Sequence, residues 1–327
     1  MKKRRFFADA LQHVYFITRD GGVLFYTTSD RLAFYTLVSV LSKRYGVVVV
    51  GMCIMFTHVH LLVRATDLSQ FRLFMGQLLK ALSKIICDDR SLRGPLLKRP
   101  FGSAPLVSSK RQRSSLIYLY NNPVEKRLCT KAIEDRWTFL AYYGNAHPFS
   151  APLVLKTASR RLRDACRLVT GEAAAGRYMR PALVRGLFRD LTQTERRQLS
   201  DFIISRYAFI DFAAAVSLFG RFDHLVRATE STTGQEFDIG EEWDPTSDVA
   251  YREMTRMAAE AGLLDNWSLL HLSAGDRAMW ARNLRVATGA TEHQVRRFLH
   301  GDEVPPGKNR DGRDKRSGAE VIDNEKE

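Results

Sequence analysis

The chain has 327 residues, of which 45% are hydrophobic and 26% are charged, a composition typical of a folded protein and unlike that of a disordered or collagen-like chain. Its formal charge is +14, and all of this excess lies in residues 1–127, because residues 128–327 hold equal numbers of basic and acidic side chains. A positive charge of this size on one part of the chain favours binding of a polyanion, most simply a nucleic acid. No apolar run is long enough to span a membrane and the basic start lacks a signal-peptide pattern, so we expect a cytoplasmic, nucleoid-associated protein.

The first part of the chain alternates between strand and helix patterns. Residues 13–19 form a short β-rich run, and an amphipathic helix is predicted over residues 31–45, with Ser29 or Asp30 as its N-cap. Two further β-rich runs, residues 47–56 and His58–Arg64, follow with almost nothing between them. Their closeness predicts a tight antiparallel hairpin.

A second amphipathic helix is predicted to open at Asp67, followed by a basic loop over residues 90–109 that holds a fourth strand near residues 96–101. The last helix of this part starts near Gln112 and is predicted to end at Asn122 and Pro123, because proline cannot continue the hydrogen-bond ladder. The order of elements indicates an α+β fold, a ferredoxin-like antiparallel sheet with its helices on one face.

Beyond this domain, assigned to residues 1–150, the chain is predicted to be mostly α-helical over residues 151–304, with one helix spanning 182–203. Residues 276–300 have the spacing of a helix-turn-helix that would present Gln294, Arg296 and Arg297 to DNA, although an ordinary helical hairpin has the same pattern. The tail, residues 305–327, is predicted to be disordered.

Two histidines, His58 and His60, lie in the second strand of the predicted hairpin. Side chains alternate across a strand, so both imidazoles project from one face while Val59 points into the core. Two imidazoles on one face can share a metal ion, but histidines with ordinary hydrogen-bond partners have the same pattern. The His-x-His spacing alone leaves both interpretations open.

Tyr118 and Asn122 lie four residues apart near the end of the last helix of this domain, and therefore on one face of it, whereas Tyr120 is turned away. If that face meets the histidines, a divalent ion could be bound by two nitrogens and one amide oxygen next to a phenol that attacks a phosphodiester. Alternatively, Tyr118 fills the core and Asn122 caps the helix.

Together these residues resemble a known family. His58-Val59-His60, followed some sixty residues later by Tyr118-Leu119-Tyr120-Asn121-Asn122-Pro123, is similar to the motifs of single-tyrosine HUH transposases of the insertion-sequence and REP-associated type. The resemblance implies that His58, His60 and Asn122 bind Mg²⁺ or Mn²⁺. It also implies that Tyr118 attacks single-stranded DNA beside a hairpin, leaving a 5′-phosphotyrosine, and that homodimers occur.

The resemblance covers roughly residues 8–150, and Phe56-Thr57 stands where the family usually has Pro-Asn. A domesticated or non-catalytic protein that binds a DNA hairpin is therefore the alternative function, and an RNA-binding domain is a third. Tyr120 is the second choice of nucleophile. Phosphate contacts are expected from six basic residues: Arg93, Lys98, Arg99, Lys110, Arg111 and Arg113.

Overall fold

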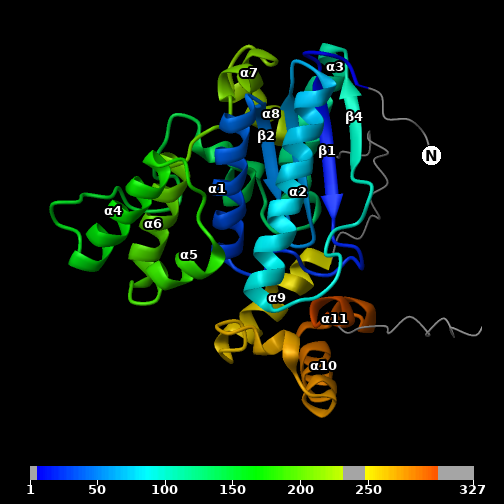
Figure 1. Cartoon of the computed structure of the whole chain (residues 1–327), viewed down its shortest axis with the longest axis vertical. Helices are drawn as coiled ribbons and strands as arrows, with labels where there is room; N and C mark the ends of the chain where they lie inside the picture. The colour runs from blue at the N-terminus through cyan, green and yellow to red at the C-terminus, as the bar shows by residue number, and fades with distance from the viewer. Residues whose placement is uncertain (1–5, 231–246, 301–327) are drawn as a thin grey trace, which may run out of the picture.

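The structure is a computed structural model that describes residues 6–230 and 247–300; the predicted tail, residues 305–327, lies outside them. Within the described residues a four-stranded sheet is combined with helices on both of its faces and beyond one of its ends (Figure 1). The sheet domain contains β1 (Leu11–Ile17), α1 (Thr28–Tyr45), β2 (Val48–Ile54), β3 (His58–Arg64), α2 (Leu68–Arg90), β4 (Gly102–Leu106) and α3 (Ser109–Glu125). The helices that follow are α4 (Arg160–Ala174), α5 (Pro181–Phe188), α6 (Gln193–Arg206), α7 (Phe212–Ser217), α8 (Phe222–Glu230), α9 (Ser247–Glu260), α10 (Ala274–Thr288) and α11 (Glu292–Phe298).

The sheet has the strand order β2-β3-β1-β4, and every neighbouring pair is antiparallel. The element order β-α-β-β-α-β is that of a ferredoxin-like layout, so the predicted α+β class and the predicted hairpin of β2 and β3 are confirmed. In the register of the sheet, His60 lies opposite Tyr15 of β1 and Cys53 of β2. This register decides which side chains share a face with the two histidines.

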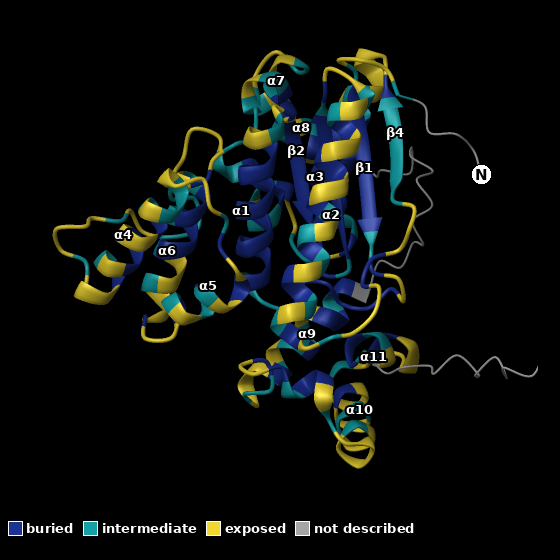
Figure 2. Ribbon diagram, in the orientation of Figure 1, coloured by how far each residue is buried: buried dark blue, intermediate teal, exposed yellow. Residues whose placement is uncertain are grey.

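Helices cover both faces of the sheet, which corrects the prediction of helices on one face. Val14, Val59 and Leu61 lie in the core under α1 and α2, whereas Leu62 lies in a second core with Leu116 and Leu119 of α3. All of these side chains are buried, because strand residues alternate and each face carries apolar positions (Figure 2). The α3 helix therefore lies on the face that carries the histidines.

Three local predictions were wrong. Helix α1 begins earlier than predicted, because Thr27 is its N-cap and Asp30 is the third helical residue of a capping box. Helix α3 continues past Pro123 to Glu125; the proline is in the last turn, where it removes a single hydrogen bond. The fourth strand is Gly102–Leu106, later than predicted, and it pairs with β1.

Of the remaining helices, α4 to α6 form one group beside α1 and α9 to α11 form a second group below the sheet in Figure 1, while α7 and α8 pack against β2 and α3. Leu162, Val169 and Ile203 of α4 and α6 belong to the same core as Val14 of the sheet, and Phe298 of α11 shares a core with Tyr26, which precedes α1. The helix predicted over residues 182–203 is two helices, α5 and α6, separated by a turn. The division at residue 150 stays a prediction, but apolar cores extend across it.

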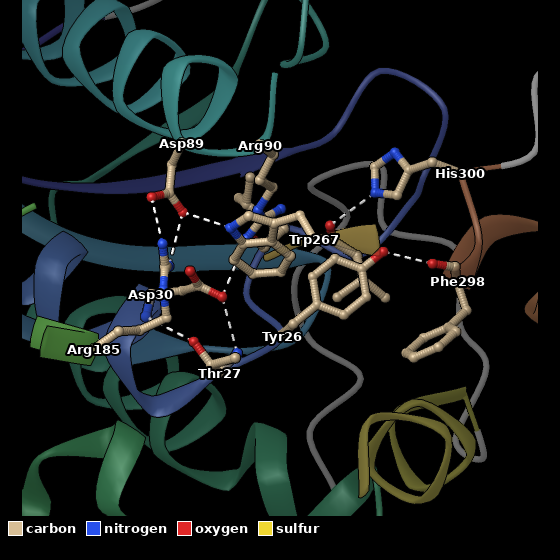
Figure 3. Close-up of polar contacts among 11 residues, drawn as sticks. Tyr26, Thr27, Asp30, Asp89, Arg90, Arg185, Trp267, Phe298 and His300 are labelled. Carbon is tan, nitrogen blue, oxygen red and sulfur yellow. Dashed lines mark hydrogen bonds and ion pairs between the residues drawn. The ribbon is translucent and has the colours of Figure 1, made fainter. Parts of the chain in front are cut away.

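A buried polar network joins these groups (Figure 3). The Arg90 Nη2 atom lies 3.1 Å from the Asp30 Oδ2 atom, with both side chains at most 1% exposed, and it donates to the Leu24 carbonyl at 2.8 Å. The Arg90 guanidinium also lies 4.5 Å from the centre of the Trp267 ring, while the indole N–H of Trp267 donates to Asp89. Arg185 of α5 forms a bidentate pair with the same Asp89 carboxylate. The end of α2 thus connects α1, α5 and the C-terminal helices.

Candidate functional site

Four polar rings from two neighbouring strands lie together on the α3 face of the sheet. The centres of the His58 and His60 rings are 5.0 Å apart, and Tyr15 of β1 lies 5.5 Å from His58 and 5.1 Å from His60. His13, two residues before Tyr15, has its ring centre 5.3 Å from that of His60. The alternation of side chains along β1 and β3 therefore collects three imidazoles and one phenol on one surface.

Tyr118 comes to this cluster from α3. Its ring centre lies 5.5 Å from that of His60 and 6.0 Å from that of His13, and the first of these pairs is close to perpendicular. The structure thus brings together the two histidines and the tyrosine that were singled out from the sequence, within one chain. The roles assigned to them, nucleophile and metal ligands, remain predictions.

Burial holds two of the three imidazoles, those of His13 and His60, in their neutral form. His13 and His60 are completely buried, and loss of hydration lowers the pKa of His13 to about 4. The pKa of His60 is well below its usual range, first because of burial and then because the nearby His58, His13 and Lys126 disfavour a further positive charge. A neutral imidazole keeps a lone pair, which is the form that binds a metal ion or accepts a proton.

One nitrogen of each expected ligand is already oriented by a protein group. Nδ1 of His60 lies 3.1 Å from Nε2 of His13, and Nδ1 of His58 lies 3.0 Å from the Thr57 hydroxyl. Such contacts hold each imidazole ring in one orientation. In the described part of the chain, no group of three or more His, Cys, Asp or Glu side chains is arranged to hold a metal.

Asn122 lies on α3, one turn beyond Tyr118, with its side chain buried. It does not cap the helix, because Lys126 is the C-cap residue, so that alternative reading is wrong. Two imidazole nitrogens and an amide oxygen suit a transition-metal ion such as Mn²⁺ better than Mg²⁺, which prefers oxygen ligands. By the chemistry of its donors, this set of His58, His60 and Asn122 would suit a divalent ion, and its role in metal binding stays a prediction.

The site includes groups that were not singled out from the sequence. His13 and Tyr15 could have been found, because they alternate on β1 in the same way as His58 and His60 on β3. Burial raises the pKa of Asp248, which lies at the start of α9. The nearby His58 and Lys126 act in the opposite direction but have a smaller effect. No sequence pattern places this aspartate near a strand almost two hundred residues away.

Tyr120, the second choice of nucleophile, is turned away from the imidazoles. It is fully buried in the core between α3 and the sheet, together with Cys53 and Leu119, and burial raises the pKa of its hydroxyl. That hydroxyl has no hydrogen-bond partner within the described residues. The two tyrosines of α3 thus have different surroundings, and only Tyr118 lies next to the histidines.

The predicted phosphate-binding residues of the sheet domain are all exposed. They lie before β4 and in the first turns of α3, and comprise Arg93, Lys98, Arg99, Lys110, Arg111 and Arg113. No ion pair between any of these six and a carboxylate is found in residues 6–230 and 247–300. Their charge is therefore available to a partner, while their role in binding DNA stays a prediction.

The three residues of the predicted helix-turn-helix differ in how accessible they are to a partner. Residues 274–298 do form two helices around Gly289, but Gln294 is buried and belongs to the capping box of α11 with Thr291. The Arg297 guanidinium packs so closely on Gly21 that a Cβ atom there would lie 2.7 Å from it. Of the three expected contacts, Arg296 alone is exposed.

No helix among the described residues has the length and apolar character needed to cross a membrane. The chain matches no protein-family model and no curated protein. Among solved structures it is similar to one described as "Structure of the REP associates tyrosine transposase bound to a REP hairpin", with 15% identity over 49% of this chain and 94% of that chain, and a TM-score of 0.36. Within the chain itself, the fold is an α+β sheet domain with a cluster of imidazoles and a tyrosine.

Proposed function

We propose that the chain is an HUH-type transposase-like enzyme, a metal-dependent transesterase that cuts and joins single-stranded DNA beside a hairpin. The observation that carries this proposal is the position of Tyr118, whose ring lies 5.5 Å from that of His60 on the adjacent strand surface. A phenol next to neutral, buried imidazoles is the pairing that nucleophilic attack on a phosphodiester requires. The motifs His58-Val59-His60 and Tyr118–Asn122 supply the family assignment.

In the proposed reaction the Tyr118 oxygen forms a bond to phosphorus while the bond from phosphorus to the 3′ oxygen breaks. The phenol loses its proton, the departing 3′ oxygen gains one, and the strand is left with a 5′-phosphate joined to Tyr118. A divalent ion held by His58, His60 and Asn122 would polarise the phosphate and stabilise negative charge on its oxygens. His13 would position His60 through its hydrogen bond to Nδ1.

The proposed substrate is DNA because of charge as well as motif. The excess positive charge lies in residues 1–127, and the exposed basic residues before β4 and at the start of α3 belong to the domain that carries Tyr118. Phosphate contacts of this kind supply affinity without reading sequence. A hairpin partner and a homodimer are part of the proposal through the family resemblance.

A covalent-adduct assay tests the proposed enzyme. The full chain is incubated with labelled hairpin DNA carrying a single-stranded flank and Mn²⁺, and denaturing electrophoresis detects a stable adduct. We expect an adduct with the unaltered chain and with Tyr120→Phe, and none with Tyr118→Phe. Tyr120 is the matched control, because it lies on the same helix but is buried among apolar side chains such as Leu116 and Leu119. An adduct that persists in Tyr118→Phe would contradict the assignment of the nucleophile.

Non-catalytic binding of a DNA hairpin is the second candidate function, and the burial of the site favours it. Tyr118 is 8% exposed and His60 is fully buried, so the site offers little surface to a DNA strand in the described structure. A protein that binds DNA without turnover would give no adduct with any variant, yet would bind the hairpin equally well with and without Tyr118→Phe. The same experiment, with binding measured by gel shift, therefore distinguishes the two functions.

A further inference from the structure

A large cleft lies between the helices beside α1 and those below the sheet. Its volume is about 1060 Å³, and its walls come from α5 and α6 on one side, α9 and the residues after it on the other, and the first turn of α1. None of the residues discussed above for metal or DNA binding lines it. The cleft is therefore a separate site in the fold.

Arginines dominate the lining of this cleft. The lining contains one carboxylate, that of Asp265, and five arginines: Arg136, Arg185, Arg189, Arg196 and Arg197. Arg136 and Arg185 are compensated by Asp201 and Asp89 respectively. Arg189, Arg196 and Arg197 are exposed and have no ion pair with a carboxylate in the part of the chain that the structure describes. The cleft thus holds a net positive charge that the protein itself does not neutralise.

Other groups in the cleft suit a nucleic-acid strand, with both its phosphates and its bases. Thr27, Thr28 and Ser29 at the N-terminal end of α1 also line the cleft, and the Thr27 hydroxyl accepts a hydrogen bond from the Asp30 backbone N–H. The positive end of a helix dipole and its backbone N–H groups favour phosphate oxygens. Trp137, which is partly exposed, also lines the cleft, and an indole face stacks on any base.

We infer that this cleft binds the sugar-phosphate backbone of a single nucleic-acid strand, as a second site distinct from the one at Tyr118. Three uncompensated arginines on one wall match a run of phosphates better than a single anion, because one phosphate would leave most of the charge without a partner. The inference rests on the proposed function only in taking DNA as the strand. Arg196 also donates to the carbonyls of Phe188 and Leu191, so it anchors the wall.

The inference is tested with the double variant Arg189→Gln/Arg197→Gln in the full chain, by fluorescence anisotropy with labelled oligothymidylate over a range of salt concentrations. Loss of two phosphate contacts should lower the slope of log affinity against log salt by about 1.4, at about 0.7 per contact for a single strand. The control is Arg160→Gln/Arg206→Gln, which removes the same charge from exposed positions on α4 and α6 outside the cleft. An equal change in both double variants would overturn the inference.

A cross-linking measurement locates the strand directly. Bromouracil-substituted DNA, and in a parallel arm the corresponding RNA, is irradiated with the unaltered chain, and the linked peptides are identified by mass spectrometry. We expect a linked peptide that contains Trp137, with whichever nucleic acid binds more tightly. Linked peptides confined to residues 1–125 that do not include Tyr26 to Ser29 would overturn the inference, as would release of the strand by an equal concentration of inorganic phosphate. Tyr118→Phe should leave this cross-link unchanged, so failure of the proposed chemistry and failure of the cleft give different results.

Discussion

Replacement of Arg90 by methionine should destabilise the protein more than loss of any exposed charge on the same helix. Methionine keeps an apolar chain of similar length but removes the cation that lies 3.1 Å from Asp30. Because both side chains are at most 1% exposed, the Asp30 carboxylate would remain buried without its counter-ion. Removal of one partner from a buried pair costs about 3–5 kcal/mol, and loss of the hydrogen bond to the Leu24 carbonyl is part of that cost.

Urea unfolding followed by far-ultraviolet circular dichroism gives the change in the free energy of unfolding. The control is Lys84→Met, which breaks the ion pair with Asp88 on the same helix; those side chains are 66% and 43% exposed. Exposed pairs contribute little, so we expect a loss of at most about 0.5 kcal/mol in the control. The double variant Asp30→Asn/Arg90→Met should recover part of the stability lost in Arg90→Met, because it removes the uncompensated charge. Equal urea midpoints for Arg90→Met and Lys84→Met would refute this reasoning.

Two further substitutions test how the outer elements pack against the sheet. Tyr26→Phe removes the hydroxyl that donates to the Phe298 carbonyl at 2.5 Å, and should lower the free energy of unfolding by about 1–2 kcal/mol. Amide hydrogen exchange should become faster in α11 but not in α4. Equal acceleration in both helices would show that this hydrogen bond does not hold α11 in place. Gly51→Ala would place a Cβ atom 2.9 Å from the Leu116 Cδ1 atom of α3 and should cost about 1–3 kcal/mol. The comparison is Gly76→Ala, at a helical position with open space around it, where thermal unfolding should show no loss of stability.

The sheet domain could be predicted from the sequence because its signals are local. The periodicity of apolar residues predicted β3 and α2. Two β-rich runs that follow each other almost directly in the sequence predicted the hairpin of β2 and β3, which the structure contains. Pro123 was misleading, since a proline in the last turn of α3 loses one hydrogen bond and packing on the sheet outweighs that loss. The face on which α3 lies also escaped prediction, because apolar residues alternate onto both faces of the strands.

The candidate site was predicted where residues share an element and missed where they come from distant ones. His58 and His60 follow from strand alternation, and Tyr118 with Asn122 follows from helical spacing. Asp248 and the arginines of the cleft are brought to their places by tertiary packing of helices whose positions no pattern in the sequence specifies. Gln294 was expected to contact DNA, but its side chain instead accepts a hydrogen bond from the Thr291 backbone N–H in the capping box of α11.

The apolar cores that extend across residue 150 limit how the molecule can be divided. A fragment that ended there would keep Tyr35 and Phe139, which stack with their ring centres 4.6 Å apart, but would lose Phe209, whose ring centre lies 4.9 Å from that of Tyr35. The outer side of α1 and the surroundings of Tyr26 would then be open to water. Such a fragment should aggregate on expression, and a soluble preparation of the sheet domain therefore needs the downstream helices that cover it.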